Sequence, residues 1–347
     1  MIRPRACSGA LVSLAIFGLM GRAQPNRPIA HYYYPVSVAA DSKGNVYVTG
    51  KGNKITKIAP DGVASDFAGD GLVRHRDGPG NIARFEDTQE MAIDASDNLY
   101  VVDYNKIRKV TPDGVVSTVA GGASSGYKDG VGAAATFTAP KYIAVAPDGR
   151  LFVVERPNGG TWTIRVVTPQ GAVTTWRRGA AGDLALDPYG IAFEANGNLI
   201  ACDGGRCIKR VTPDGSVTTI AGLCWKRKWN PVYKEGDVAT AELMEPLHVA
   251  VSARGDIWVS DQRLHRVISV GGGKVATVAG NGKIDTEKSN IGGYADPGLL
   301  DGPAKQALFN GIEGIAFDRA GNLYIADTMN QCIRKLSAGG AVTTFSK

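Results

Sequence analysis

Three side chains suited to acid–base or ligand chemistry occupy one corresponding position in different copies of an internal repeat. These residues are Glu90, Tyr142 and His248. A carboxylate and an imidazole brought together can share a proton or bind a divalent cation, with calcium and zinc as the candidates. Catalysis or metal binding by Glu90 and His248, with Tyr142 beside them, is therefore one hypothesis. The alternative is that the three groups bond to one another and to the backbone and only fill space.

A second candidate is a short aromatic and basic segment, Trp225-Lys226-Arg227-Lys228-Trp229. Tryptophan rings stack on sugar rings and attract cations, and three adjacent cations attract anionic polymers. The segment is therefore a candidate ligand-binding loop. The alternative is a loop whose tryptophans pack on neighbouring elements while its cations stay in solvent.

Acidic residues recur at the end of the second apolar run of five repeat copies, where the first copy has Gly50 instead. They are Asp103, Glu155, Asp203, Asp261 and Asp327. Each begins a turn, where a carboxylate can accept hydrogen bonds from backbone N–H groups two residues further on. We expect this structural role, together with a negative field on the face where the acids gather.

The cysteines favour one disulfide. A turn at 213–215 folds the chain back so that Cys207 lies near Gly222, two residues before Cys224. The pair Cys207–Cys224 is therefore predicted, with Cys202–Cys207 as the rival, and Cys332 is left without a late partner. No CxxC spacing or histidine cluster accompanies the cysteines, which argues against a metal site among them.

The repeat fixes the elements that must position these groups. The second copy shows it as Met91-Ala92-Ile93, then 98–103, 107–110, a Pro-Asp-Gly turn and 116–121. Four short strands in each of six such copies predict an all-β, six-bladed β-propeller of four-stranded antiparallel blades. The expected blades span about 32–69, 88–121, 139–179, 188–222, 246–280 and 312–346.

The first strand of each blade should line a central channel. Alignment of the copies places a ring of alanines at one depth: Ala39, Ala92, Ala144, Ala192, Ala250 and Ala316. Six small residues predict a narrow, crowded bore. Two residues earlier, toward the channel mouth, the copies read Ser37, Glu90, Tyr142, Gly190, His248 and Gly314. Ser37 is thus a further candidate ligand-binding residue.

Connectors between blades have a repeat of their own, in which an acidic residue and glycine precede an alanine and a large apolar residue. The apolar anchors are Phe85, Phe137, Leu243 and Phe309. We expect each connector to insert its anchor between adjacent blades, and burial of such a phenylalanine contributes roughly 2 to 3 kcal/mol. The longest insertions, 223–245 and 281–310, are the best candidates to shape a binding face. Ring closure is left open, because the first and last copies both look complete.

The N-terminus predicts a signal peptide over residues 1–23, with the propeller occupying 24–347. Arg3 and Arg5 precede a short apolar stretch at 10–20, and small residues surround Ala23. The alternative is a disordered apolar tail. Removal of 1–23 lowers the formal net charge of +6 by the three arginines it contains. We therefore expect a secreted or periplasmic monomer with no membrane span and no nucleic-acid partner.

The chain resembles the NHL-repeat β-propellers. The resemblance rests on 321–327 (Gly-Asn-Leu-Tyr-Ile-Ala-Asp), Asn330, 332–336 and the Val-Thr-Thr-Val-Ala-Gly type of strand end, and it extends over most of the chain after residue 23. It implies six blades and leaves activity open, since the family includes binding modules and a zinc-dependent amidating lyase, and related propellers include calcium-dependent lactonases. The lyase's several histidine ligands are matched only by His248, and the lactonase carboxylates by Glu90 and Glu313.

Two functions follow as hypotheses. The first is a scaffold that binds a protein or a glycan. The second is a metal-assisted lyase or hydrolase with its site at the channel mouth. The repeat determines the fold, but the fold alone does not decide between these functions.

Overall fold

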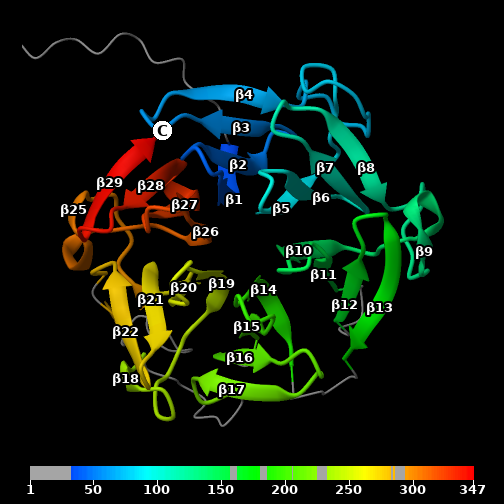
Figure 1. Ribbon diagram of the computed structural model, residues 1–347. Helices are drawn as coiled ribbons and strands as arrows, with labels where there is room; N and C mark the ends of the chain where they lie inside the picture. Colours follow the sequence, from blue (N-terminus) through cyan, green and yellow to red (C-terminus); the bar gives the residue numbers. More distant parts are fainter. Residues whose placement is uncertain are drawn as a thin grey trace, which may run out of the picture.

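The computed structural model describes residues 33–156, 162–179, 186–204, 206–224, 233–282, 284–285 and 294–347. Six antiparallel sheets of four or five strands stand around a central axis, as Figure 1 shows. The predicted six-bladed propeller is therefore confirmed. Residues 1–23, the expected signal peptide, lie outside the described residues.

The first three blades follow the chain in order. Blade one consists of β1 (Tyr33–Ala40), β2 (Val46–Lys51), β3 (Ile55–Ile58) and β4 (Ala64–Ala68). Blade two consists of β5 (Thr88–Ile93), β6 (Leu99–Asp103), β7 (Lys106–Val110) and β8 (Val116–Ala120). Blade three consists of β10 (Pro140–Val145), β11 (Leu151–Glu155), β12 (Thr163–Val167) and β13 (Ala172–Arg178).

The last three blades have the same plan. Blade four consists of β14 (Pro188–Phe193), β15 (Leu199–Asp203), β16 (Cys207–Val211) and β17 (Val217–Ala221). Blade five consists of β19 (Pro246–Val251), β20 (Ile257–Asp261), β21 (Arg266–Gly271) and β22 (Lys274–Ala279). Blade six consists of β26 (Ile312–Phe317), β27 (Leu323–Asp327), β28 (Cys332–Leu336) and β29 (Ala341–Ser346).

The connectors add short outer strands. β9 (Gly130–Val131), β18 (Gly236–Asp237) and β25 (Gly302–Pro303) pair with β13, β22 and β29. A separate two-stranded ribbon is formed by β23 (Ile284–Asp285) and β24 (Tyr294–Ala295), and single 3-10 turns occupy Gly132–Ala134, Ala304–Gln306 and Thr328–Asn330. The expected anchors are buried, because Phe85, Phe137, Leu243 and Phe309 are at most 1% exposed.

Second strands are buried along most of their length, as in β6, where all five residues are buried. Each is covered on both faces by neighbouring blades, which is why its sequence is an apolar run and not an alternation. The repeated Asn-x-Tyr at its start has a structural use. Asp94 accepts hydrogen bonds from the backbone and side chain of Asn98 and from the Tyr100 hydroxyl, and so closes the turn between β5 and β6.

The six alanines line a central cavity of about 220 Å³, as the sequence predicted. Ring closure, which the sequence left open, occurs without strand exchange among the described residues. Blade one and blade six each draw four strands from one continuous stretch of chain and pack side by side. The Thr328 hydroxyl donates to the carbonyl of Pro35 across the joint, at 2.7 Å.

Candidate functional site

Glu90, Tyr142 and His248 meet at the axis, although they come from blades two, three and five. Nδ1 of His248 lies 3.2 Å from Oε1 of Glu90. The rings of Tyr142 and His248 meet edge to face, with centroids 5.5 Å apart. The structure therefore brings together the three side chains that the sequence placed at the channel mouth.

Two polar atoms of this cluster are buried without a hydrogen-bond partner among the described residues. They are Oε2 of Glu90 and the hydroxyl of Tyr142. Tyr142 is only 4% exposed. Burial, followed by the negative charge of Glu90, raises the pKa of this phenol far above its ordinary value, so it is a neutral donor. Buried polar groups are rarely left without partners, so the cluster is suited to receiving a ligand.

A second carboxylate lies beside the cluster on the same side of the axis. Gln262 donates its amide to Oε1 of Glu313 at 3.2 Å. Burial raises the pKa of Glu313 above its ordinary value, and the charge of Glu90 adds to the rise, while His248 and Lys141 oppose it. Gln262 and Lys141 were missed in the sequence. Lys141 adjoins Tyr142 in the chain, and this proximity was the one signal in the sequence that could have placed it near the cluster.

Small residues at the remaining positions have a steric cause. A Cβ on Gly190 would lie 2.6 Å from the carbonyl oxygen of Leu247, and one on Gly314 would lie 2.7 Å from Cα of Ser37. Inner strands of adjacent blades therefore approach too closely for a side chain. Ser37 lines the central cavity, but its hydroxyl accepts a hydrogen bond from the backbone N–H of Met91, which joins blades one and two.

Glu90 and His248, the residues considered for a metal ion, supply few ligands on their own. Zinc needs three or four protein ligands, and calcium needs more oxygen atoms than Glu90 supplies. In the part of the chain that the structure describes, no three His, Cys, Asp or Glu side chains are grouped so as to hold a metal ion. Glu90 and His248 contact each other as a pair.

The five acids that end the second strands differ from expectation. All are fully buried, and their main partners are not the N–H groups two residues further on. Asp103 accepts from the backbone N–H groups of Glu86 and Asp87 in the preceding connector, and it pairs with the buried guanidinium of Arg108 at 2.6 Å. These carboxylates therefore anchor connectors. In blades two, three, four and six a buried cation offsets the expected negative field on this face.

Blades three and six repeat this unit, in which a buried arginine of the third strand joins the second-strand acid to an aspartate of the connector. Arg165 bonds to Glu155 at 2.8 Å and to Asp129 of the connector at 2.7 Å. Arg334 bonds likewise to Asp327 and Asp301. Each guanidinium also lies over the connector's phenylalanine ring, about 5 Å from its centroid. These arginines were not predicted as partners from the sequence.

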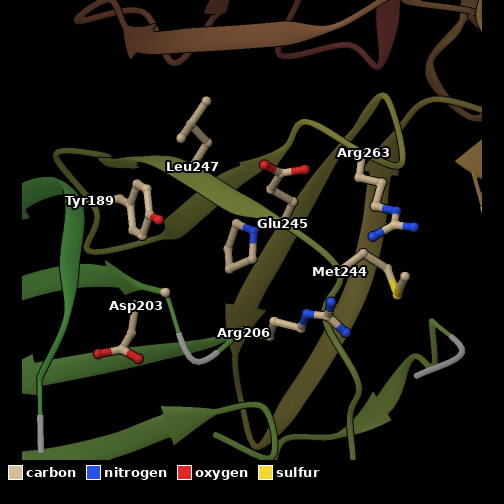
Figure 2. A pocket seen from close by; sticks show the side chains of 9 residues that line it. Tyr189, Asp203, Arg206, Met244, Glu245, Leu247 and Arg263 are labelled. Atoms are coloured by element: carbon tan, nitrogen blue, oxygen red, sulfur yellow. The ribbon is translucent and has the colours of Figure 1, made fainter. Parts of the chain in front are cut away.

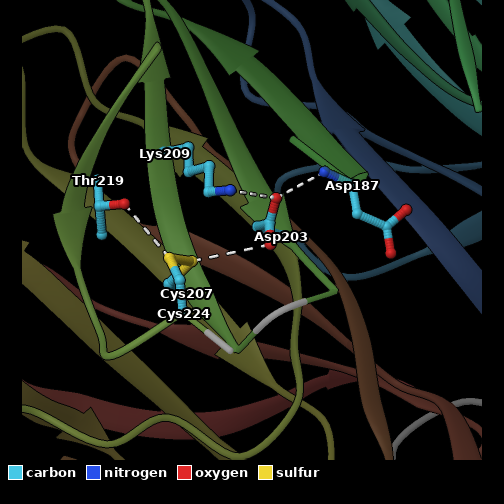
Figure 3. Close-up of a disulfide and its surroundings, with 6 residues drawn as sticks. All are labelled: Asp187, Asp203, Cys207, Lys209, Thr219 and Cys224. Atoms are coloured by element: carbon cyan, nitrogen blue, oxygen red, sulfur yellow. Dashed lines mark hydrogen bonds and ion pairs between the residues drawn. A yellow bond between two sulfur atoms is a disulfide. The ribbon is translucent and has the colours of Figure 1, made fainter. Parts of the chain in front are cut away.

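Cys207 and Cys224 form a disulfide, which is the pairing that the sequence favoured (Figure 3). It ties the first residue of β16 to the segment after β17. Cys202 and Cys332 are buried free thiols. Lys209 pairs with Asp203 at 3.2 Å beside the disulfide, so blade four uses a lysine where blades two, three and six use arginine.

A surface pocket of about 200 Å³ lies between blades four and five. It opens where inner strands begin and second strands end. We call this side, along which the connectors run, the connector face. Figure 2 shows the charged side chains of Arg206, Glu245 and Arg263 around the pocket, together with Tyr189 of β14 and Leu247 of β19. Asp203, Gly204, Met244 and Pro246 complete its lining.

The candidate ligand-binding segment Trp225–Trp229 lies outside the described residues.

Comparisons with known proteins place the chain in a family. The model of the teneurin NHL domain matches residues 26–185. Teneurin-m of Drosophila melanogaster is 26% identical over 201 residues, which make up 53% of this chain and 7% of the Drosophila protein. The protein is an NHL-repeat propeller. The family that the sequence motifs indicated is thereby confirmed.

Solved structures share the fold of this NHL-repeat propeller. An auxiliary nutrient binding protein from Bacteroides thetaiotaomicron superposes with a TM-score of 0.62 and 16% identity, covering 88% of this chain and 69% of that one. A gluconolactonase from Xanthomonas campestris superposes with a TM-score of 0.54 and 15% identity, covering 87% and 85%. At such identities the likeness concerns the fold alone. Among the described residues, no helix is long and apolar enough to cross a membrane.

Proposed function

We propose that this NHL-repeat propeller is an exported binding module whose connector face recognises a partner protein or a glycan. The observation that carries the proposal is the pocket between blades four and five. It combines two guanidinium groups, an exposed carboxylate and a tyrosine ring within one hollow of a rigid scaffold. Binding pockets characteristically combine apolar walls with a few polar groups that fix orientation.

The chemistry of the pocket suits a polar ligand. Arg206 and Arg263 supply donors only, and Glu245 supplies acceptors. Tyr189 and Leu247, on the inner strands β14 and β19, offer apolar surface to the pocket. Sugar hydroxyls, or the polar side chains of a protein segment, can use both kinds of charged partner. The fold shared with an auxiliary nutrient binding protein is consistent with a binding role.

The test compares the pocket with the same position in another blade. Glu245→Gln alters the pocket, whereas Asp87→Asn alters the corresponding residue just before the inner strand of blade two. Purified protein is applied to a glycan array and used in a pull-down from extracellular extract. We expect Glu245→Gln and Arg263→Gln to lose any ligand that the wild type captures, and Asp87→Asn to keep it. Equal retention by all variants would exclude this pocket.

The aromatic and basic segment is tested in the same assay. Trp225→Ala and Trp229→Ala remove the stacking surfaces, and Lys226, Arg227 and Lys228 can be exchanged for glutamine. The proposal predicts that these changes weaken binding, because the segment immediately follows Cys224 and precedes the blade-five connector.

A lyase or hydrolase remains a second candidate, supported by the contact of His248 with Glu90 beside a neutral tyrosine hydroxyl. In this case His248→Ala and Glu90→Gln would abolish turnover of lactones or amidated peptides while the fold stays intact. Elemental analysis after dialysis without chelator tests the metal-assisted version, for which about one calcium or zinc per chain is required.

A further inference from the structure

The central cavity is chemically unlike the pocket on the connector face. Its lining comes from the inner strands β1, β5, β10, β14, β19 and β26 and consists of aliphatic residues, one methionine, two phenylalanines, one glycine, Ser37 and Glu90. Glu90 is the one charged residue of that lining. The hydroxyl of Ser37 already accepts a backbone hydrogen bond. The channel is therefore an apolar bore whose one charged lining residue is Glu90.

The lining extends along the inner strands from Glu90 to Ile93 and the corresponding residues of the other blades. Three strand residues span about 10 Å. At the far end, Ile93, Phe193 and Phe317 are partly exposed, so the bore opens there. At the Glu90 end, Tyr142 and His248 are more than nine-tenths buried. The carboxylate thus stands at the inner end of a narrow channel that is entered from the face opposite the connectors.

The carboxylate is only half satisfied. Oε1 contacts His248, but Oε2 is buried without a hydrogen-bond partner among the described residues. A charge beside an apolar wall is stabilised strongly by a group that brings both opposite charge and hydrogen-bond donors. A divalent cation would need several more oxygen ligands, which the bore does not provide. An ammonium group needs only the carboxylate and room for its hydrocarbon chain.

We propose that the central channel binds the primary ammonium group of a linear aliphatic amine, with the ammonium at Glu90 and the hydrocarbon chain along the alanine-lined bore. The six alanines keep the bore narrow, which favours an unbranched chain. A free alkylamine and the side chain of a lysine on a partner protein present this same chemistry. The site is separate from the pocket of the proposed binding function, so each can fail without the other.

The first experiment titrates the protein without the expected signal peptide (residues 24–347) calorimetrically with n-hexylamine, 1-hexanol and cyclohexylamine. We expect n-hexylamine to bind with one site per chain and at least tenfold more tightly than either of the others, because hexanol lacks the charge and cyclohexylamine lacks the slender shape. Shortening the amine from hexyl to butyl should weaken binding about fourfold per methylene removed. Equal affinity for hexanol, or no dependence on chain length, would overturn the proposal.

Variants locate the ammonium. Glu90→Gln keeps the size of the side chain and should weaken n-hexylamine binding about 10- to 100-fold. Glu313→Gln removes a carboxylate that lies at the axis but does not line the bore, so it should change the affinity less than fivefold. Circular dichroism and thermal unfolding check that both variants fold. The chain-length series on the wild type decides the question even if Glu90→Gln does not fold.

Nα-acetyl-lysine amide, which keeps a free side-chain ammonium group, distinguishes a free alkylamine from a lysine of a partner protein. Binding of n-hexylamine alone supports a free amine, because the peptide backbone stays outside a narrow bore. Binding of the lysine derivative as well supports a partner lysine inserted into the channel. Failure of both compounds to bind overturns the proposal, whereas the glycan and pull-down results for Glu245→Gln stand independently.

Discussion

At the scale of single residues, Asp261 differs from the other buried acids, whose side chains pair with an arginine or lysine of the third strand. Ile268 occupies the position in blade five that Arg108 occupies in blade two, since each faces the middle residue of the second strand. The carboxylate of Asp261 accepts hydrogen bonds from the backbone N–H groups of Met244, Glu245 and Leu264. Burial raises its pKa from 3.8 to about 6, although these hydrogen bonds lower it.

This difference predicts a particular dependence of stability on pH. A carboxyl group with a higher pKa in the folded state binds its proton more readily when folded, so ionisation destabilises the fold. The penalty is fully present above pH 6 and is relieved as the pH falls from about 6 to about 4. With the folded value near 6 and the unfolded value of 3.8, the relief is on the order of 2 to 3 kcal/mol.

Urea unfolding of the wild type and of Asp261→Asn at pH 7.5, 6 and 5 tests this prediction. The asparagine does not titrate, so the difference in the free energy of unfolding isolates Asp261 from other groups, including nearby Glu245. We expect the wild type to gain stability relative to the variant as the pH is lowered. A difference that stays constant across this range would show that Asp261 does not titrate as predicted.

At the scale of elements, the connector is held to its blade by a buried arginine. Arg334 joins Asp327 on β27, Asp301 on the connector and the carbonyl groups of Leu300 and Leu308. Arg334→Ala leaves Asp327 buried without its cation. Loss of one partner of a buried ion pair destabilises a fold by about 3 to 5 kcal/mol. We therefore expect a loss of this size in the free energy of unfolding.

Chemical unfolding monitored by tryptophan fluorescence measures the loss. Arg319→Ala provides the control, since Arg319 is exposed and such changes usually stay within about 0.5 kcal/mol. Arg334→Lys should recover only part of the loss, because lysine cannot make the same forked contacts. A loss below about 1 kcal/mol in Arg334→Ala would contradict the role given to this unit.

A second prediction at this scale concerns the stability that the disulfide contributes. Cys207 and Cys224 close a loop with a sequence separation of 17. A bridge over a loop of this length stabilises by about 3 kcal/mol. Cys224→Ser should therefore lower the melting temperature, and reductant should then have no further effect on the variant. Cys332→Ser serves as the control, because Cys332 is a free thiol and the variant should retain its sensitivity to reductant.

The sequence predicted the strands well because each blade repeats the same apolar and turn residues, and each four-stranded blade falls within its expected range. It also brought Glu90, Tyr142 and His248 to one place. The pairing of acids with arginines was missed, since these partners lie in different strands and connectors. A signal existed in the co-occurrence of connector aspartate and third-strand arginine in the same three blades, namely Asp77 with Arg108, Asp129 with Arg165, and Asp301 with Arg334.

At the scale of the whole molecule, the ring closes through the packing of blade one against blade six. The joint depends on Gly314, where a Cβ would lie 2.7 Å from both Cα of Ser37 and the carbonyl oxygen of Val36. Both atoms belong to the backbone, so a side chain can be accommodated only if β1 and β26 move apart. Gly314→Ala should therefore weaken closure and lower the free energy of unfolding by about 1 to 3 kcal/mol, the usual range for an overpacked site.

Gly271→Ala is the matched control, because a Cβ there meets no atom within 4 Å. Unfolding should remain a single transition in the control and broaden or split in Gly314→Ala, where terminal blades can separate first. Limited proteolysis should then cleave blade one or blade six before the others. If Gly314→Ala unfolds like the control, the close packing of β1 against β26 does not limit stability. The closed ring would then depend on the apolar cluster of Val38, Val48, Tyr324 and Ile333, which blades one and six share beside the joint.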